Sequence, residues 1–427
     1  MGHLAAKQAY GKLRQKLDGM PVGAPGETTI YEILKVLFTP EEAAIGARMP
    51  LKLSSLSAIS RKTNIPETEL QKRLEAMAEK GIVLDLHIGE KVRYMLTPTI
   101  VGFFEFSMMR ARDDFDQAEL AKLLHRYMLE ERDFSGQFDP ASRTSPFRTL
   151  VHEKTLPKDF TEVLSYERAT EIIEDSKRYA VGLCHCRHIA HHMGRECTVF
   201  EMESCLTIGP GVDYALRHRL AREISKSEAL DLIWRTRDAK MVHLCDNVQE
   251  RPTFLCSCCG CCCEVLVGFR KFEIFGNTYS SNFEARIVDD ECIGCKKCKK
   301  ACPIDAIDMT NMAHMVKGKK IKKLAKVDLD VCLGCGVCAL ACENEALTMV
   351  PRAKRRLVPE SAFARVLMMA IEQGKLQELL FDKDDGLGAL AANVLLGAIT
   401  KLPPAKQLLA RDAIKSRFVE FMLSKMH

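Results

Sequence analysis

The sequence predicts a multidomain α+β protein with a cysteine-rich centre between two helix-rich ends. Its 427 residues are enough for several hydrophobic cores. The apolar fraction of 47% and the charged fraction of 28% are those of a globular chain, which excludes wholesale disorder. All 19 cysteines lie between Cys184 and Cys342. Five successive parts are expected: a helical domain over 1–110, a helical linker over 111–160, cysteine-rich domains over 161–285 and 286–352, and a helical C-terminal region over 353–427.

The N-terminal part predicts helices followed by a hairpin. The expected elements are helices over 28–38, 41–48, 55–59 and 67–80, and strands over 82–87 and 91–96. This order resembles a winged-helix domain, which implies a DNA-binding module. The helix over 67–80 would then enter the major groove, yet its net charge is −1. We therefore favour a structural or protein-docking module over DNA binding.

Two similar units follow in the first cysteine-rich domain. Segments 167–184 and 228–245 each predict a helix and then a short apolar strand that ends in Leu-Cys. Duplication and chance remain equally open as the origin of this similarity. A duplication would place Cys184 and Cys245 at equivalent strand ends that face one shared site.

The clearest motif is a repeated cysteine spacing within residues 286–352. The pattern Cx2Cx2Cx3C occurs twice, at Cys292, Cys295, Cys298 and Cys302 and again at Cys332, Cys335, Cys338 and Cys342. Two-residue gaps let a tight loop present three thiolates to three corners of an iron–sulfur cube. Gly294, Gly334 and Gly336 allow the backbone to approach the cluster closely. With these motifs, the segment resembles a bacterial ferredoxin that holds two [4Fe–4S] clusters.

The resemblance implies interleaved ligand sets and an electron-transfer function. One cluster would be held by Cys292, Cys295, Cys298 and Cys342, and the other by Cys332, Cys335, Cys338 and Cys302. The chain departs from the family by having Glu343 after the last cysteine, where a proline is usual, and by a longer link between the two motifs. Neither departure removes a ligand. Zinc in two all-cysteine sites is the weaker alternative, because interleaved motifs of this kind are not zinc spacing.

Eleven cysteines remain as candidate metal ligands upstream of this module: Cys184, Cys186, Cys197, Cys205, Cys245, Cys256, Cys258, Cys259, Cys261, Cys262 and Cys263. The i, i+2 pairs Cys184/Cys186 and Cys256/Cys258 place both thiols on one face if the chain is extended. The arrangement CxCR…CxCCxCCC resembles a family of multi-iron–sulfur proteins from anaerobes whose activity is incompletely characterised. We expect one or two additional iron–sulfur clusters in this region. A zinc site and thiol redox chemistry are the alternatives.

Polar residues accompany the upstream cysteines. Arg187 can offset cluster charge and donate hydrogen bonds without competing as a ligand. Three nearby histidines have a helical metal-ligand spacing, but no HExxH motif accompanies them. We expect the histidines of this region to line or hydrogen-bond a cluster pocket: His185, His188, His191, His192 and His243.

The net charge of +5 comes from one segment. Residues 291–330 contain ten lysines and five acidic residues, so the rest of the chain is balanced. Lysine runs are usually solvated surface. Because these lie within and between the two cysteine motifs, they could also steer an acidic redox partner toward the clusters. A single basic patch does not indicate a nucleic-acid binder.

The sequence shows no export signal at its N-terminus, and its longest uncharged apolar stretch, residues 386–400, is too short to span a bilayer. An odd number of clustered thiols, without an export signal, indicates metal ligation in a reducing cytoplasm. The helical C-terminal region is expected to serve packing or a homo-oligomer surface.

The leading hypothesis is a cytoplasmic multi-cluster iron–sulfur protein, typical of anaerobic metabolism. It would mediate single-electron transfer between a redox partner and its own cysteine-rich cluster domain. One alternative is an oxidoreductase, in which a substrate-binding cluster in the cysteine-rich domain is fed by the ferredoxin clusters. A second alternative is a redox-sensing DNA-binding regulator. No GxGxxG or GxxxxGK[ST] motif indicates a nucleotide cofactor.

Overall fold

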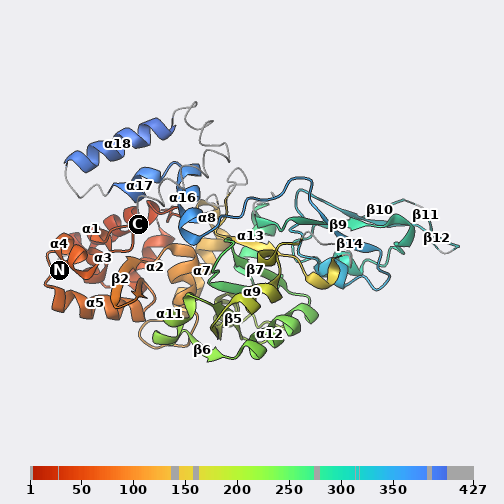
Figure 1. Ribbon diagram of the computed structural model, residues 1–427, viewed down its shortest axis with the longest axis horizontal. Helices are drawn as coiled ribbons and strands as arrows, with labels where there is room; N and C mark the ends of the chain where they lie inside the picture. Colours follow the sequence, from red (N-terminus) through yellow and green to blue (C-terminus); the bar gives the residue numbers. More distant parts are fainter. Residues whose placement is uncertain are drawn as a thin grey trace.

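The computed structural model describes residues 3–26, 28–135, 144–156, 163–273, 279–312, 314–316, 318–381 and 387–401. The molecule is elongated, with helices at one end, a six-stranded sheet in the middle and a module with a long β-ribbon at the other end (Figure 1). Helices and strands both occur throughout, which confirms the mixed α+β content. None of the described helices is long and apolar enough to cross a membrane.

The N-terminal part has helices followed by a hairpin, in the predicted order. Its elements are α1 (His3–Asp18), α2 (Thr29–Leu37), α3 (Pro40–Arg48), α4 (Leu56–Thr63), α5 (Glu67–Glu79), β1 (Val83–Ile88) and β2 (Lys91–Leu96). The Thr39 side chain accepts a hydrogen bond from Glu42 N and so caps α3. Ser55 caps α4 by accepting from Ala58 N, and the helix continues past its predicted end at Ile59. The winged-helix assignment itself stays a prediction.

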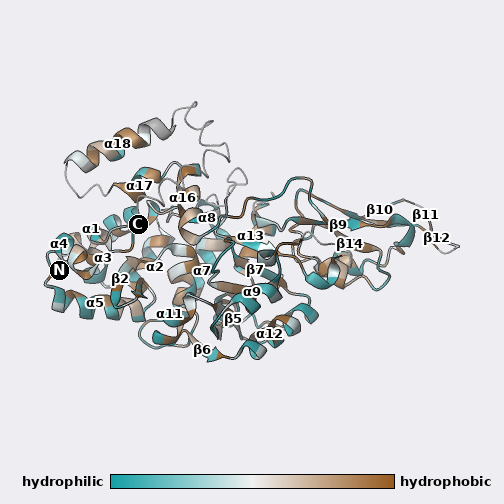
Figure 2. Ribbon diagram, in the orientation of Figure 1, coloured by the Kyte–Doolittle hydropathy of each residue, from teal (hydrophilic) through white to brown (hydrophobic). Residues whose placement is uncertain are grey.

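The hydrophobic core of this part continues beyond residue 110. The next elements are an irregular turn over Thr99–Phe103, a π-helical turn (Arg126–Glu130), and the helices α6 (Phe104–Phe106), α7 (Gln117–His125) and α8 (Arg132–Ser135). Buried side chains from Ala9 to Phe134 form one cluster, in which Leu120 and Leu124 of α7 are fully buried. The helices are banded brown and teal in Figure 2, as amphipathic helices should be. The segment predicted as a linker thus packs into the N-terminal core, and the domain boundaries stay predictions.

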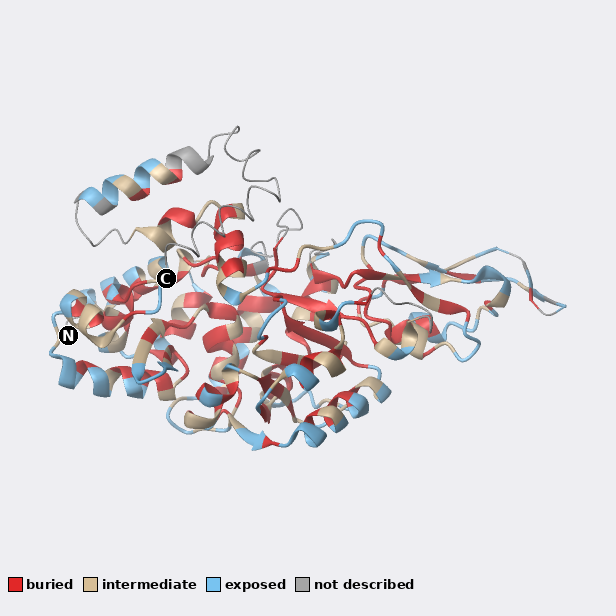
Figure 3. Cartoon of the chain, in the orientation of Figure 1, coloured by how far each residue is buried: buried red, intermediate tan, exposed pale blue. Residues whose placement is uncertain are grey.

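A six-stranded antiparallel sheet forms the middle of the molecule. Its strands, in spatial order, are β3 (Phe147–Leu150), β7 (Val242–Asp246), β8 (Phe254–Cys258), β5 (Glu203–Ile208), β4 (Tyr179–Leu183) and β6 (Ala221–Ile224). The helices of this region are α9 (Ala169–Asp175), α10 (His185–His192), α11 (Gly211–Arg217), α12 (Lys226–Asp238) and α13 (Glu264–Phe272). Helices α9 and α12 cover one face and bury Leu206 and Leu255 beneath them. Figure 3 shows most of the sheet as buried.

The two similar segments each form a helix and a strand, α9 with β4 and α12 with β7. The two strands are not neighbours, because β8 and β5 lie between them. Cys184 follows β4 and begins α10, whereas Cys245 lies within β7 opposite Leu255. The expectation that Cys184 and Cys245 occupy equivalent strand ends facing one site is therefore wrong.

The module that follows the sheet is built from three antiparallel strand pairs. Its elements are β9 (Phe283–Ile287), α14 (Lys297–Ala301), β10 (Ile307–Thr310), β11 (His314–Val316), β12 (Lys319–Ile321), β13 (Leu324–Val327), α15 (Val337–Leu340) and β14 (Leu347–Pro351). Strand β9 pairs with β14, β10 with β13 and β11 with β12. The long link between Cys302 and Cys332 therefore forms the projecting ribbon of Figure 1.

The C-terminal helices pack back onto the rest of the chain. They are α16 (Ala362–Glu372), α17 (Leu376–Leu380) and α18 (Leu387–Lys401). Arg365 of α16 forms an ion pair with Asp246 of β7. Lys375 donates to the carbonyl of Met20, 3.0 Å away, so the tail contacts both the sheet and the N-terminal part. The last part of the predicted helical C-terminal region, residues 402–427, lies outside the described residues.

An ionic contact fastens the N-terminal hairpin to α11. The Asp85 carboxylate of β1 accepts from Arg217 Nη1 at 2.5 Å and contacts His218 Nε2 at 2.8 Å. Burial alone would raise the pKa of Asp85, but the hydrogen bonds from His218 and Arg217 hold this pKa below its ordinary value. The ionised carboxylate therefore stabilises the folded chain above the ordinary Asp pKa, and this stability is lost as the pH falls through the lowered pKa.

We expect Asp85→Asn to destabilise the fold by about 2 kcal/mol near neutral pH, the range of a charged hydrogen bond. Asp213→Asn is the matched control, since Asp213 pairs with the same Arg217 at 3.0 Å but is 52% exposed. This control should cost less than about 1 kcal/mol. Anaerobic thermal unfolding from about pH 7 down to about pH 2 measures both, and the Asp85→Asn deficit should shrink only below about pH 4, where the carboxyl begins to be protonated. Equal deficits for the two variants, or a deficit independent of pH, would contradict this account.

Candidate metal centres

The eight cysteines of the module over 283–351 fall into two sets of four, each around its own cavity. The outer set contains Cys292, Cys295, Cys298 and Cys342. The inner set contains Cys302, Cys332, Cys335 and Cys338. The chain thus brings together the same fours that the ferredoxin resemblance implies. Their role as ligands remains a prediction.

The surroundings of the inner set fit a cluster held by four thiolates. The backbone N–H of Ala306 donates to Cys302 Sγ at 3.2 Å, and that of Gly334 to Cys332 Sγ at 3.4 Å. Burial raises the pKa of Cys335, and with it the cost of ionising the thiol before a metal binds. Gly334 has φ +69°, and a Cβ there would lie 2.0 Å from the carbonyl oxygen of Phe283, so only glycine allows this approach.

A group of four upstream cysteines lies where the loop after α10 meets the turn between β8 and α13. We call Cys197, Cys259, Cys261 and Cys262 the four-thiol group, because their sulfurs all lie within 4.8 Å of one another. Cys197 Sγ is 3.7 Å from Cys259 Sγ and 3.9 Å from Cys261 Sγ, and Cys261 and Cys262 are 3.6 Å apart. Hydrogen bonding from Cys262, helped by the charge of Arg187, lowers the pKa of Cys259 to about 4. A thiolate is the form of cysteine that binds metal.

Arg187 contacts both the four-thiol group and strand β8. Its side chain is buried at 1% exposure, and its Nε donates to Cys197 Sγ at 3.4 Å. The same guanidinium donates to the Ser257 carbonyl of β8 at 3.2 Å. Burial would lower the pKa of Arg187, yet the neighbouring Cys184 and Cys259 raise it. Arg187 therefore places a buried positive charge among the thiols.

Six further upstream cysteines are called the six-thiol group: Cys184, Cys186, Cys205, Cys256, Cys258 and Cys263. Their thiols perturb one another: Cys184 and Cys263 raise the pKa of Cys186, Cys263 raises the pKa of Cys258, and Cys205 raises the pKa of Cys256. Cys256 and Cys258 share one face of β8, as their i, i+2 spacing predicts. Cys184 and Cys186 are brought together differently, because Cys184 begins α10 and Cys186 lies in its first turn.

Comparison with known proteins identifies only the module over 283–351. Residues 291–346 match the 4Fe-4S dicluster domain. This match supports a ferredoxin-like module with iron–sulfur cofactors, and hence an iron–sulfur electron-transfer protein. No curated protein and no solved structure matches the chain. The match begins at residue 291, downstream of the last upstream cysteine, Cys263, so it does not cover the upstream cysteines.

Cys245 is the upstream cysteine that the fold separates from both groups and from the dicluster module. It pairs with Leu255 in the β7–β8 register and lies with it in the core under α9 and α12. Its recorded electrostatic neighbours are Arg148 and Arg365, and burial raises its pKa to about 11. Because side chains alternate along a strand, Cys245 points away from the face that carries Cys256 and Cys258.

The histidines contact the thiols less than expected. Only His185 is recorded next to a sulfur among the described histidines, with Nε2 3.2 Å from Cys186 Sγ. His188 Nδ1 donates to the Met108 carbonyl at 2.8 Å, and its Nε2 lies 3.2 Å from His192 Nε2. The remaining two contact other groups, His191 lying 3.6 Å from Glu196 and His243 3.0 Å from Thr236 Oγ1. Their expected role beside a cluster remains a prediction.

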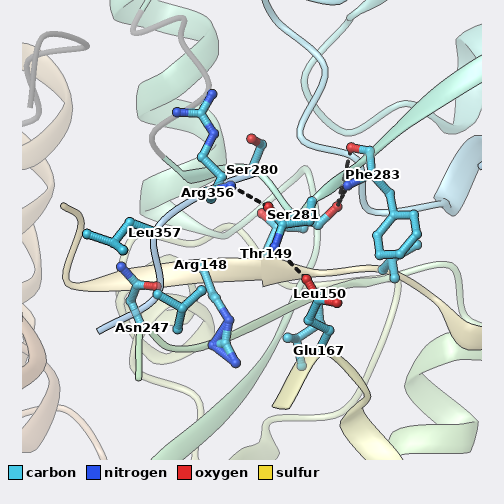
Figure 4. A pocket seen from close by; sticks show the side chains of 13 residues that line it. Arg148, Thr149, Leu150, Glu167, Asn247, Ser280, Ser281, Phe283, Arg356 and Leu357 are labelled. Carbon is cyan, nitrogen blue, oxygen red and sulfur yellow. Dashed lines mark hydrogen bonds between the residues drawn. The ribbon is translucent and has the colours of Figure 1, made fainter. Parts of the chain in front are cut away.

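A small polar pocket lies between β3, the segment before β9 and the segment before α16 (Figure 4). Asn282 Nδ2 donates to Glu167 at 2.5 Å, and the Arg356 backbone N–H donates to Asn282 Oδ1 at 2.5 Å. Thr149 Oγ1 donates to the Tyr279 carbonyl at 2.8 Å. These bonds link the segment before β9 to β3, to Glu167 and to the segment before α16.

Sequence reasoning did not divide the upstream cysteines into these groups. It also missed His152, whose backbone N–H donates to the Cys335 carbonyl at 3.0 Å and whose ring nitrogen donates to the Met241 carbonyl at 2.8 Å. This residue thereby ties β3 to the loop of the inner set. No motif marks His152, since its role depends on contacts between segments distant in sequence.

The separation of Cys245 can be tested by metal analysis. We expect Cys245→Ala to retain the full iron and sulfide content of the parent, with a stability loss of about 1 kcal/mol from the lost buried atom. Cys335→Ala is the matched control, also a buried cysteine, and should lose about four irons per chain. Anaerobic iron and acid-labile sulfide assays measure both. Loss of iron from Cys245→Ala would show that Cys245 is a ligand after all.

Proposed function

We propose that this chain is a multi-cluster iron–sulfur protein that carries single electrons between an external redox partner and its own cysteine-rich part. The observation that carries this proposal is the contact between the dicluster module and the upstream thiols. When bound, [4Fe–4S] clusters supply one-electron chemistry with potentials set by burial, charge and hydrogen bonds.

The inner set of thiols meets the turn that carries the upstream cysteines. A Cβ on Gly260 would lie 3.2 Å from Cα of Pro303, the residue directly after Cys302. Arg270 of α13 donates to the Gly260 carbonyl at 2.7 Å and holds this turn in place. One apolar cluster encloses Cys258 and other thiols of the six-thiol group together with those of the module. Close, dry packing of this kind suits electron transfer between neighbouring centres.

The outer set faces away from the sheet and carries the lysines. Cys295 is exposed, unlike the buried Cys335 of the inner set. Eight lysines of the module have exposed side chains, namely Lys296, Lys297, Lys299, Lys300, Lys320, Lys322, Lys323 and Lys326. Met312 and Met315 are also exposed, at 52% and 59%. Cationic residues around apolar side chains suit the docking of an acidic partner protein.

An enzymatic alternative has one observation in its favour. The six-thiol group has more thiols than one cubane uses, and Glu264 directly follows its Cys263. Glu264 is 2% exposed, contacts His125 at 3.2 Å through Oε1, and has no recorded hydrogen-bond partner for Oε2 in the described structure. An acid at such a site suits a reductase that binds a substrate there. Small molecules that perturb the spectrum of one centre alone would favour this alternative.

The iron content tests the central claim. We expect anaerobically prepared protein to contain at least about eight irons per chain with matching sulfide, because two [4Fe–4S] clusters require that number. Reduction with dithionite should produce electron paramagnetic resonance signals of reduced cubanes. Fewer than about eight irons after full reconstitution would refute the proposal.

Charge reversal tests the docking surface. We expect Lys320→Glu/Lys322→Glu/Lys323→Glu to slow reduction by a small acidic electron-transfer protein about tenfold or more at low salt. The difference should fade toward about 1 M salt, where charges are screened. The rate with dithionite should not change.

The control for this variant carries the same change in net charge on the distant N-terminal helices. It is Lys7→Glu/Lys12→Glu/Lys35→Glu, at three exposed lysines of α1 and α2. Equal slowing of the two triple variants would show an effect of total charge and contradict a docking role for the ribbon.

A further inference from the structure

The four-thiol group differs in kind from the two sets of the dicluster module. We propose that Cys197, Cys259, Cys261 and Cys262 bind one metal ion in tetrahedral thiolate coordination, as a centre separate from the iron–sulfur clusters. The ion belongs to the zinc and ferrous or ferric iron class, for which four thiolates in a tetrahedron are an established environment. The inference does not depend on the proposed electron-transfer function.

The sulfur–sulfur distances carry the argument. Four thiolates that share one ion at a metal–sulfur distance of about 2.3 Å lie about 3.8 Å apart, the edge of a tetrahedron. The recorded distances are 3.6, 3.7 and 3.9 Å, and all four sulfurs lie within 4.8 Å of one another. Thiolates of a cubane each bind a different iron, and their sulfurs lie about 6 Å apart. The group is therefore too compact for a cube and has the size required for one ion.

The local sequence explains why these thiols are so close. Cys261 and Cys262 are adjacent in the chain and their sulfurs lie 3.6 Å apart, a separation that suits two ligands of one ion. Cys259 precedes them by two residues in the same tight turn. Cys197 approaches from the loop after α10 and closes the set across a long sequence separation. Such a set can form only in the folded chain, so metal binding and folding of this turn are linked.

The charge balance fits a closed structural site. Four thiolates around a divalent ion have a net charge of −2, and the buried Arg187 donates to Cys197 and offsets part of it. Four protein ligands leave no coordination position for a substrate. The turn so fixed also carries Gly260, which packs against Pro303, and it leads from Cys258 to Cys263 of the six-thiol group. The ion would thus hold the junction between the upstream thiols and the dicluster module.

X-ray absorption and elemental analysis of the anaerobic full-length protein test the proposal. We expect one zinc per chain, or one iron in excess of sulfide, with four sulfur ligands at about 2.3 Å and no metal neighbour for that ion. Elemental analysis distinguishes the two metals. A protein in which every metal atom is accounted for by iron–sulfide clusters would overturn the proposal. This outcome leaves the count of at least about eight cluster irons untouched, so the two proposals fail separately.

A variant provides the second test. Cys261 is exposed, so Cys261→Ser should fold, and we expect it to lose the single ion while keeping the iron and sulfide of the parent. Cys295→Ser is the matched control, also an exposed cysteine, and should disturb the outer cluster without removing the single ion. Loss of about four irons and four sulfides from Cys261→Ser would indicate a cubane and overturn the proposal. Unchanged metal content would overturn it equally.

Discussion

The alternation of side chains along β8 is the constraint on which the arrangement of the thiols depends. Leu255 lies on the face covered by α9 and α12, and Cys256 and Cys258 therefore lie on the opposite face. The chain then turns sharply, brings Cys259, Cys261 and Cys262 together with Cys197, and enters α13. A shift of one residue in this register would exchange the apolar core for the metal-binding face. The hydrophobic packing beneath α9 and α12 thus determines which cysteines can meet a metal.

Burial and metal binding support each other in the central and C-terminal parts. Many of the thiols lie in the same apolar cluster as the side chains of Leu333 and Val337. Such surroundings raise the free energy of an isolated thiolate, as the raised pKa of Cys335 shows. A bound cation removes this penalty by offsetting the charge, so the folded chain favours metal over protons at these sites. The backbone donors at Ala306 and Gly334 further stabilise negative sulfur.

Local patterns predicted much of the fold and of the dicluster module. Ser55 caps a helix because its side chain bonds to the backbone three residues away, a relation that a sequence displays directly. The Cx2Cx2Cx3C repeat is likewise local. The exception is the fourth cysteine of each repeat, which lies with the first three cysteines of the other repeat. The packing of α7 into the N-terminal core was not predicted, because a helical linker and a core helix have the same periodicity. The position of Cys245 depends on the order of strands in the sheet, which no local pattern specifies.

The division of the upstream cysteines shows how far spacing alone can be used. Spacing in the sequence led to an expectation of one or two additional iron–sulfur clusters, with a zinc site as an alternative. It could not identify Cys197 as the partner of the turn at 259–262, since the contact spans more than sixty residues. Once this contact is known, the distances decide the kind of centre: sulfurs near 3.8 Å share one ion, and more widely spaced sulfurs surround a cluster. The proposed single-ion site and the dicluster module would thus differ in how tightly each loop gathers its sulfurs.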